Sequence, residues 1–137
     1  MDPSRHAIDP KRASMAQFSG AFPDALPLVM VNLVRLRERA EDLDGRAPRS
    51  GRAAYAEYSR QVMPLLAAVG GKPLWMGRAH ASLVAPEGEA WDEVLLVQYP
   101  SREAFLKMIR SSEYRAIVHH RTAALSDSRL IATVAEA

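Results

Sequence analysis

The stretch that most restricts the fold is LVMVNLVRL, residues 28–36, which has aliphatic side chains at both odd and even positions. A short run of branched aliphatic residues after a proline is typical of a buried β-strand. Successive side chains of a strand point to opposite faces of the sheet, so a strand that is apolar on both faces needs cover on both. A second run, WDEVLLVQY at 91–99, has the same character. We therefore expect a sheet with no face left in water.

The segment between these two strands predicts one helix and one further strand. Apolar residues recur at every third or fourth position through 51–69, as in an amphipathic helix, and two glycines follow at 70 and 71. Residues 72–84, KPLWMGRAHASLV, are expected to form a long strand.

The segment after the strand at 91–99 predicts a helix in two pieces and a last strand. Ser101 is a suitable N-cap for the first piece, and RSSE at 110–113 offers a second cap, from which a helix continues to about Leu125. Residues 128–134, SRLIATV, are expected to form the last strand.

The resulting order, β-α-β-β-α-β, predicts an α+β fold of the ferredoxin-like type. In that arrangement a four-stranded antiparallel sheet carries both helices on one face. The other face then lacks cover, and a second copy of the chain packed sheet to sheet would supply it. We expect a homodimer through the open sheet face, which makes a dimeric α+β barrel.

The length of 137 residues suits a single domain. Residues 1–27 contain four prolines and one short helical pattern, formed by Met15, Phe18 and Phe22. We interpret 1–27 as an N-terminal arm with a short helix that packs on the domain, and 28–137 as the ferredoxin-like domain itself.

Composition excludes several classes of function. The chain has no cysteine, which rules out disulfides, thiolate nucleophiles and cysteine-based zinc sites. Its net charge of +2 and its interleaved acidic and basic residues argue against nucleic-acid binding. No apolar run could cross a membrane, and the first ten residues lack the apolar segment of a signal peptide, so a cytoplasmic location is expected. No phosphate loop or nucleophile elbow is present, and no cofactor is expected.

Two adjacent histidines, His119 and His120, first suggest a metal site. Neighbouring residues on a helix point about 100° apart, so the pair cannot hold one ion, and the i, i+4 spacing of helical metal ligands is absent. His6 and His80 have no carboxylate at a ligand interval. We expect no metal site, and both histidines of the pair at the surface or its rim.

Arg121 is the residue that departs from the helical pattern. It falls on the apolar side of the helix, which is formed by Tyr114, Ile117, Val118 and Leu125. A guanidinium turned toward a core costs several kcal/mol unless acceptors meet it. One interpretation is an internal salt bridge, for which the candidate acids are Glu57, Asp92, Glu93 and Glu113, or a long side chain whose charged end reaches water. The other is a pocket in which Arg121 binds a carboxylate, enolate or phosphate oxygen of a ligand.

Five further residues are candidates for a ligand site. Asn32 interrupts an aliphatic strand, and a buried amide needs partners. Tyr55 and Tyr58 lie on the helical stripe that faces the sheet, where their hydroxyls can belong to the core or to a pocket. Arg78 and His80 share the more polar side of the strand at 72–84.

Several segments together resemble a bacterial family, domain of unknown function 1330. The similar segments are MVNLVRLRERA, GRAAYAEYSRQVMPLLAAVGGKPLWMGR, WDEVLLVQYPSREAFLKMIRSSEY and HHRTAALSDSRLI, which together span about 28–132. The most specific part is the strand followed by Pro-Ser-Arg-Glu, then Ser-x-Glu-Tyr and a later arginine.

The resemblance implies the dimeric α+β barrel superfamily, which includes cofactor-free monooxygenases, isomerases and haem-dependent enzymes. It matches Arg121 to the family's arginine and Asn32 to its strand asparagine. The chain departs from many relatives at 105–108, where a tryptophan often stands. Haem-dependent relatives use a histidine ligand, and no histidine of this chain stands out for that role.

Two functions remain open at this stage, and so does the question of whether the chain is an enzyme. The first is a small enzyme without metal or cofactor, in which Arg121 stabilises negative charge on a small anionic or carbonyl-bearing metabolite between helices and sheet. Asn32 and Tyr58 would position the ligand, and His80 is a distant candidate acid or base. The second is a non-catalytic homodimeric binding or structural protein, with Arg121 in an internal salt bridge.

Overall fold

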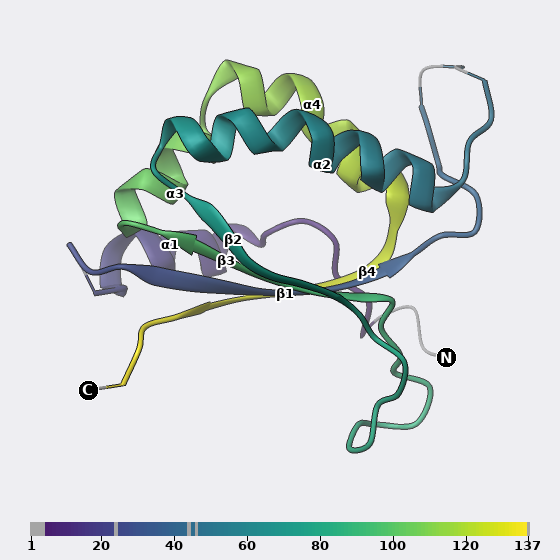
Figure 1. The fold of residues 1–137 in the computed structure, drawn as a ribbon, viewed down its shortest axis with the longest axis horizontal. Helices are drawn as coiled ribbons and strands as arrows, with labels where there is room; N and C mark the ends of the chain where they lie inside the picture. Colours follow the sequence, from purple (N-terminus) through teal and green to yellow (C-terminus); the bar gives the residue numbers. More distant parts are fainter. Residues whose placement is uncertain (1–4, 24, 44, 46, 137) are drawn as a thin grey trace.

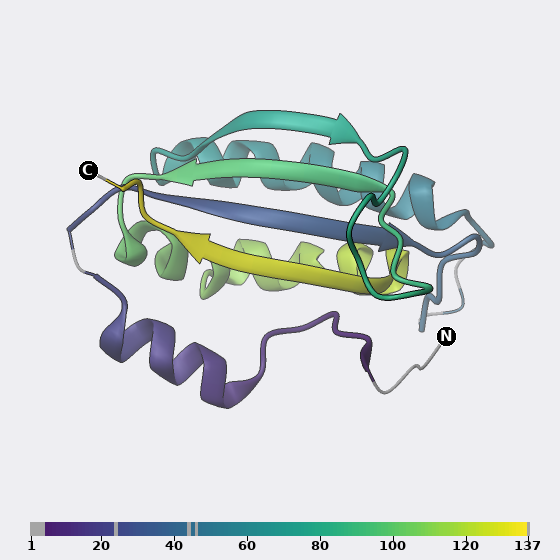
Figure 2. The same cartoon turned by 90° about the horizontal axis from the view of Figure 1, so that it is seen from below.

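Four antiparallel strands form one sheet in the order β2-β3-β1-β4 (Figures 1 and 2). The computed structural model describes residues 5–23, 25–43, 45 and 47–136. The strands are β1 Leu28–Leu36, β2 Lys72–Arg78, β3 Glu93–Tyr99 and β4 Leu125–Thr133. The central strand β1 pairs with β3 and β4, and β2 pairs with β3. This is the predicted ferredoxin-like arrangement.

The helices are α1 Arg12–Ala21, α2 Gly51–Ala68, α3 Arg102–Ile109 and α4 Ser112–Ala124. Helices α2 and α4 lie over one face of the sheet and leave the other bare (Figure 1). The predicted division between α3 and α4 follows from two caps. The Ser101 side chain accepts a hydrogen bond from the Ala104 N–H, and that of Ser111 accepts one from the Tyr114 N–H.

The strand predicted at 72–84 is too long. Strand β2 ends at Arg78, because its partner β3 begins only at Glu93, the residue opposite Arg78 in the ladder. Beyond that pair the Ala79 N–H donates one more hydrogen bond to the Asp92 carbonyl oxygen, at 2.9 Å, and the residues from there to 92 form a loop. Strand β4 starts earlier than predicted, at Leu125 instead of 128, directly after α4.

The core is divided into two clusters between the sheet and its helices. The first cluster consists of Leu28, Met30, Leu66, Tyr99, Phe105, Leu106 and Met108. The second cluster consists of Val34, Ala54, Tyr55, Leu95, Ala124 and Leu125. Helix α1 runs beside β4 (Figure 2), and its Met15 and Phe18 pack against the first cluster together with Phe22.

The bare face of the sheet is apolar. One row across it consists of Leu96, Val31 and Ile131, and the Ile131 residue is 50% exposed. The loop between β2 and β3 projects on this same side (Figure 1), and it carries Leu83 and Val84, which are almost fully exposed. An apolar sheet face of this kind is normally covered by another surface.

Candidate functional site

A cavity of about 640 Å³ lies between the helix-covered face of the sheet and the helices. Each of the eight helices and strands contributes to its wall, and so does the segment that precedes α1. Residues of both core clusters line it. Protein interiors are close-packed and seldom contain voids much larger than one water molecule. A gap of this size is therefore a feature of the molecule that needs a reason.

Four of the six candidate residues line this cavity: Asn32, Tyr55, Tyr58 and Arg121. They come from β1, α2 and α4, three elements far apart in the sequence. The other two candidates, Arg78 and His80, are exposed and do not line it. The early end of β2 explains their position, because Arg78 is the last residue of the strand and His80 lies in the loop beyond it. The structure gives neither of them a place beside the other four.

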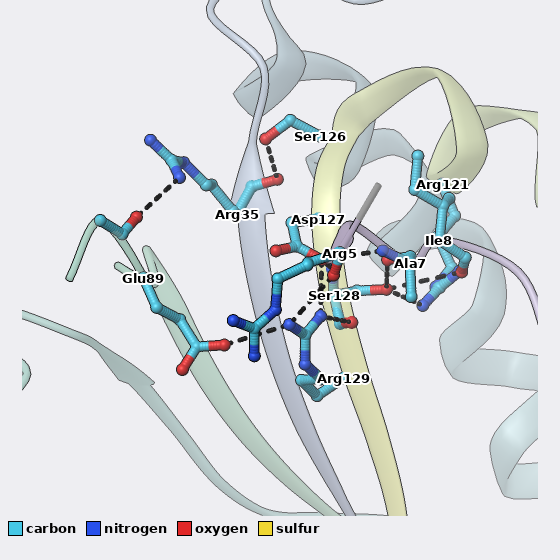
Figure 3. A network of polar contacts seen from close by, with 11 residues as sticks. Arg5, Ala7, Ile8, Arg35, Glu89, Arg121, Ser126, Asp127, Ser128 and Arg129 are labelled. Atoms are coloured by element: carbon cyan, nitrogen blue, oxygen red, sulfur yellow. Dashed lines mark hydrogen bonds and ion pairs between the residues drawn. The ribbon is translucent and has the colours of Figure 1, made fainter. Parts of the chain in front are cut away.

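Arg121 is held by neutral partners. Its Nη1 donates a hydrogen bond to the carbonyl oxygen of Ile8 at 2.6 Å, and its Nη2 lies 3.5 Å from the Ser128 hydroxyl (Figure 3). No carboxylate pairs with it in the part of the chain that the structure describes. The expected salt bridge to Glu57, Asp92, Glu93 or Glu113 is thus not observed. These acids contact, respectively, Arg60 and Gln61, the Leu36 N–H, Arg52, and Ser112.

Two tyrosines of α2 reach the cavity beside a third from α4. The hydroxyls of Tyr58 and Tyr114 lie 3.0 Å apart and share a hydrogen bond. Burial raises the pKa of Tyr55 to about 12, although the positive charge of Arg121 partly opposes the shift. Burial also raises the pKa of Tyr58 well above its ordinary value, with a further contribution from Tyr114. These hydroxyls stay protonated at neutral pH and act as hydrogen-bond donors or acceptors, not as bases.

Asn32 faces the helices, which the strand pattern alone left open. It lies on the same face of β1 as the buried residues Met30 and Val34, which are two positions away on either side. Its amide nitrogen makes one long contact, 3.4 Å, with the Met30 carbonyl oxygen. Its side-chain oxygen accepts no hydrogen bond from any described residue. A partly open amide beside a cavity is suited to bind a ligand.

The position predicted for His120 is wrong. Its residue is only 6% exposed, and its Nε2 lies 3.4 Å from the amide nitrogen of Gln61. The helical wheel included Leu125 on the apolar side of the helix, but Leu125 belongs to β4. When Leu125 is left out, the centre of the buried side of α4 shifts toward His120. The buried residues of α4 are Ile117, His120, Ala123 and Ala124. His119 is exposed, and no group of three His, Asp or Glu side chains suited to a metal ion occurs among the described residues.

The segment before α1 supplies a wall of the site that the sequence did not predict. Ser128 donates a 2.7 Å hydrogen bond to the carbonyl oxygen of Ala7, and the Ala7 N–H donates one to Asp127 at 2.9 Å (Figure 3). Nη1 of Arg129 donates a hydrogen bond of 2.6 Å to the same carboxylate. These contacts join positions about as far apart as the chain allows, so no local pattern could have indicated them.

Solved structures of other proteins resemble this one. Two structures of the RPA0582 protein, one methylated and one from Rhodopseudomonas palustris described as of unknown function, are 44% and 42% identical, with TM-scores of 0.89 and 0.88. Each alignment covers 96% of this chain, and 96% and 98% of the other. No curated protein matches the chain.

More distant structures share the fold at low identity. A dimeric protein of ferredoxin-like fold from Bacteroides fragilis NCTC 9343 is 12% identical, with a TM-score of 0.52 over 80% of this chain and 96% of that one. The hydroxynitrile lyase of Passiflora edulis is 8% identical, with a TM-score of 0.57 over 82% and 95%.

The family model that matches this chain is described as a domain of unknown function. It covers residues 49–134, which include α2, α3, α4 and the strands β2, β3 and β4. The match extends over more than half of the sequence. The chain belongs to the family Domain of unknown function (DUF1330).

Proposed function

We propose that this chain binds a small anionic or carbonyl-bearing molecule in the cavity between sheet and helices, with Arg121 as the group that meets its negative charge. The observation that carries the proposal is that Arg121 lines the cavity with only neutral partners. A carbonyl and a hydroxyl engage two of its five N–H donors, and no described residue supplies a counter-ion for its charge. A carboxylate would add a charge-assisted, bidentate interaction.

The size and the other polar groups of the cavity support the same proposal. Ligand pockets typically measure about 300–1,000 Å³ and combine an apolar wall with a few polar groups; this cavity, at about 640 Å³, lies within that range. Asn32 offers an amide, and Tyr55 and Tyr58 offer neutral hydroxyls. These groups would fix the orientation of a ligand whose charge is at Arg121.

Binding without catalysis agrees best with the composition of the wall. Among the described residues that line the cavity there is no histidine and no glutamate, and Asp9 is the only carboxylic acid. Asp9 is exposed and lies 3.4 Å from the Thr122 hydroxyl. The candidates for a general base on the wall are this exposed acid and Lys11, whereas binding needs only the arginine and its neutral neighbours.

A second copy of the chain is our proposal for the cover of the bare sheet face. The row of Leu96, Val31 and Ile131 gives that face an apolar centre, and the exposed Leu83 and Val84 extend it. Burial of apolar surface drives association, and a sheet face is self-complementary under twofold symmetry. The ferredoxin-like protein of Bacteroides fragilis, which shares the fold, is described as dimeric.

The test of ligand binding compares two arginines of α4. Wild-type protein is screened by thermal shift against small carboxylic and keto acids, and the Kd of each hit is measured by calorimetry. We expect Arg121→Met to weaken binding at least about tenfold, or 1.4 kcal/mol, and Arg121→Lys to retain part of it. The control is Arg115→Met, since Arg115 is exposed on the same helix and does not line the cavity.

Circular dichroism of each variant checks that the fold is intact. Unchanged binding by a folded Arg121→Met would overturn the role of this arginine. A wild-type protein that no acid in the panel stabilises would overturn the proposal as a whole.

A further inference from the structure

Methionine and aromatic side chains gather on the wall of the cavity. The chain has six methionines, and all those after Met1 line this cavity: Met15, Met30, Met63, Met76 and Met108. All four tyrosines line it as well: Tyr55, Tyr58, Tyr99 and Tyr114. Phe18 and Phe105 complete the set. These residue types are thus concentrated at one place instead of being spread through the core.

This composition suits an apolar ligand with a ring. Methionine is unbranched and polarisable, adapts its shape to a guest, and forms favourable contacts between sulfur and aromatic rings. Two of the five, Met63 on α2 and Met76 on β2, are 42% and 58% exposed although they line the same cavity. Flexible apolar side chains that are open to solvent at the edge of a cavity can close over a ligand.

The aromatic residues of the cavity wall contact one another edge to face, and the ring of a ligand could add a further contact of this kind. Phe105 is in edge-to-face contact with Phe18, with ring centroids 5.6 Å apart, and with Tyr99, at 5.1 Å. Tyr58 and Tyr114 form a second edge-to-face pair, at 6.2 Å. Aromatic rings favour this geometry, and each ring beside the cavity offers a face or an edge to another one.

The volume of the cavity is larger than a compact acid alone would fill. A water molecule takes up about 30 Å³ of liquid, so the cavity holds on the order of 20 waters, given its volume of about 640 Å³. A three-carbon keto acid would displace only a few of them. A ligand that fills the site has many more non-hydrogen atoms.

Arg121 and three of the methionines lie beside different core clusters. Arg121 bonds to Ile8, which packs against the second cluster. Met30 and Met108 belong to the first cluster, and Met15 packs against it. A ligand that contacts both has its charge beside Arg121 and its apolar body beside those methionines.

We infer that the ligand is an aryl-substituted acid, with its anionic group at Arg121 and its aromatic body among the methionine and aromatic side chains of the first cluster. The inference rests on the proposed function and names the ligand class for the same site. It predicts a binding preference that neither the arginine nor the cavity volume alone would require.

The experiment uses the methionine methyl groups as reporters. Wild-type protein carrying ¹³C-methyl methionine is titrated with 2-naphthylacetate, with its neutral amide and with pyruvate, and calorimetry gives each Kd. We expect 2-naphthylacetate to bind at least about tenfold more tightly than pyruvate and than the amide. Its ring should shift the methyl signals of Met15, Met30 and Met108, assigned by single Met→Leu variants.

A pair of variants on α2 tests where the ring lies. Val62 lines the cavity and packs against the first cluster, so Val62→Trp should fill the space for the ring, reduce naphthylacetate binding at least about tenfold and spare pyruvate. Ala67→Trp, at an exposed position of the same helix, should change neither affinity. The wild-type titration stands even if Val62→Trp fails to fold.

The outcomes separate this inference from the proposed function. If pyruvate binds as tightly as naphthylacetate, the aryl class is wrong while the anion site stands. If the amide binds as tightly as the acid, the anionic head is wrong, and the role of Arg121 with it. If no probe binds or shifts a methionine methyl signal, both proposals are overturned.

Discussion

Nη1 of Arg121 donates a 2.6 Å hydrogen bond to the main-chain carbonyl oxygen of Ile8, although 113 positions separate the two residues. The acceptor is a backbone atom, so no side-chain substitution at position 8 removes it. It is also a dipole and not a full charge, and a carboxylate would compete with it for the guanidinium. The N-terminal arm and the proposed anionic ligand would therefore meet at the same side chain.

Tyr58→Phe should lower the free energy of unfolding by about 0.5–1.5 kcal/mol, because it removes a buried hydrogen bond. Tyr114→Phe should do the same, and the double variant should lose less than the sum, since the two hydroxyls bond to each other. Urea unfolding of the three variants measures the coupling. Tyr99→Phe is the control, because the Tyr99 hydroxyl has no partner among the described residues. Strictly additive losses would contradict a direct bond between Tyr58 and Tyr114.

Stability at acid pH should depend on Asp127. Its burial would raise its pKa, but hydrogen bonds from the Ala7 N–H, from Arg129 and from the Ser128 N–H outweigh burial and lower it. A lowered folded-state pKa stabilises the protein above the unfolded value of about 4, and this contribution is lost as pH falls through the folded value.

Asp127→Asn should therefore be less stable than wild type at neutral pH, and the difference should shrink as the pH approaches 3, a value chosen from the ordinary carboxyl pKa of roughly 4. Urea unfolding at a series of pH values gives the difference directly. Thr122→Ala, which removes the longer contact to Asp9 in the same arm, should show no such dependence. A constant difference at all pH values would contradict a charged Asp127 as the anchor.

Gly51→Ala should destabilise the fold by about 3 kcal/mol, because a Cβ at this position would collide with the carbonyl oxygen of Arg37. Gly20→Ala is the matched change in another helix. A Cβ at Gly20 meets nothing within 4 Å, so the substitution should stabilise the protein by about 0.5–1 kcal/mol. Midpoints of urea unfolding test both. Equal effects of the two substitutions would show that helix propensity, not the close approach to Arg37, decides.

Ile131→Glu should convert the proposed dimer to a monomer, because it puts a charge into the apolar row that crosses the bare sheet face. Light scattering at micromolar protein concentration should give twice the chain mass for wild type and the chain mass for the variant. Leu43→Glu is the control, since Leu43 is fully exposed and lies outside the four strands of the sheet. A wild-type protein that is monomeric under these conditions would refute sheet-to-sheet association.

The fold could be predicted because its signals are local. Branched aliphatics at 28–36 indicated β1, the apolar spacing after Gly51 indicated α2, and the serines at 101 and 111 indicated the starts of α3 and α4. The end of β2 could not be predicted in this way. It depends on where the neighbouring strand, β3, begins. The apolar residues 81, 83 and 84 instead resemble a continuation of β2.

The candidate site could be predicted only in part, for a related reason. The helical pattern identified Arg121 as a charged residue on an apolar side, and the strand pattern identified Asn32. The pattern failed for His120, because the wheel included Leu125, which lies in β4. The contacts of Ala7 with β4 had no sequence signal, since they depend on the position of β4 at the edge of the folded sheet.

The hydrogen bonds of Ala7 and Ile8 reach Asp127, Ser128 and Arg121 across 120, 121 and 113 positions. Closing a loop between such distant positions costs conformational entropy, and contacts of this kind tend to form late in folding. The arm can dock only once β4 has joined the sheet, so the chain gains this wall of the cavity in its last assembly step. We expect the same wall to detach first when the molecule opens locally, which would expose Arg121 and the cavity to solvent.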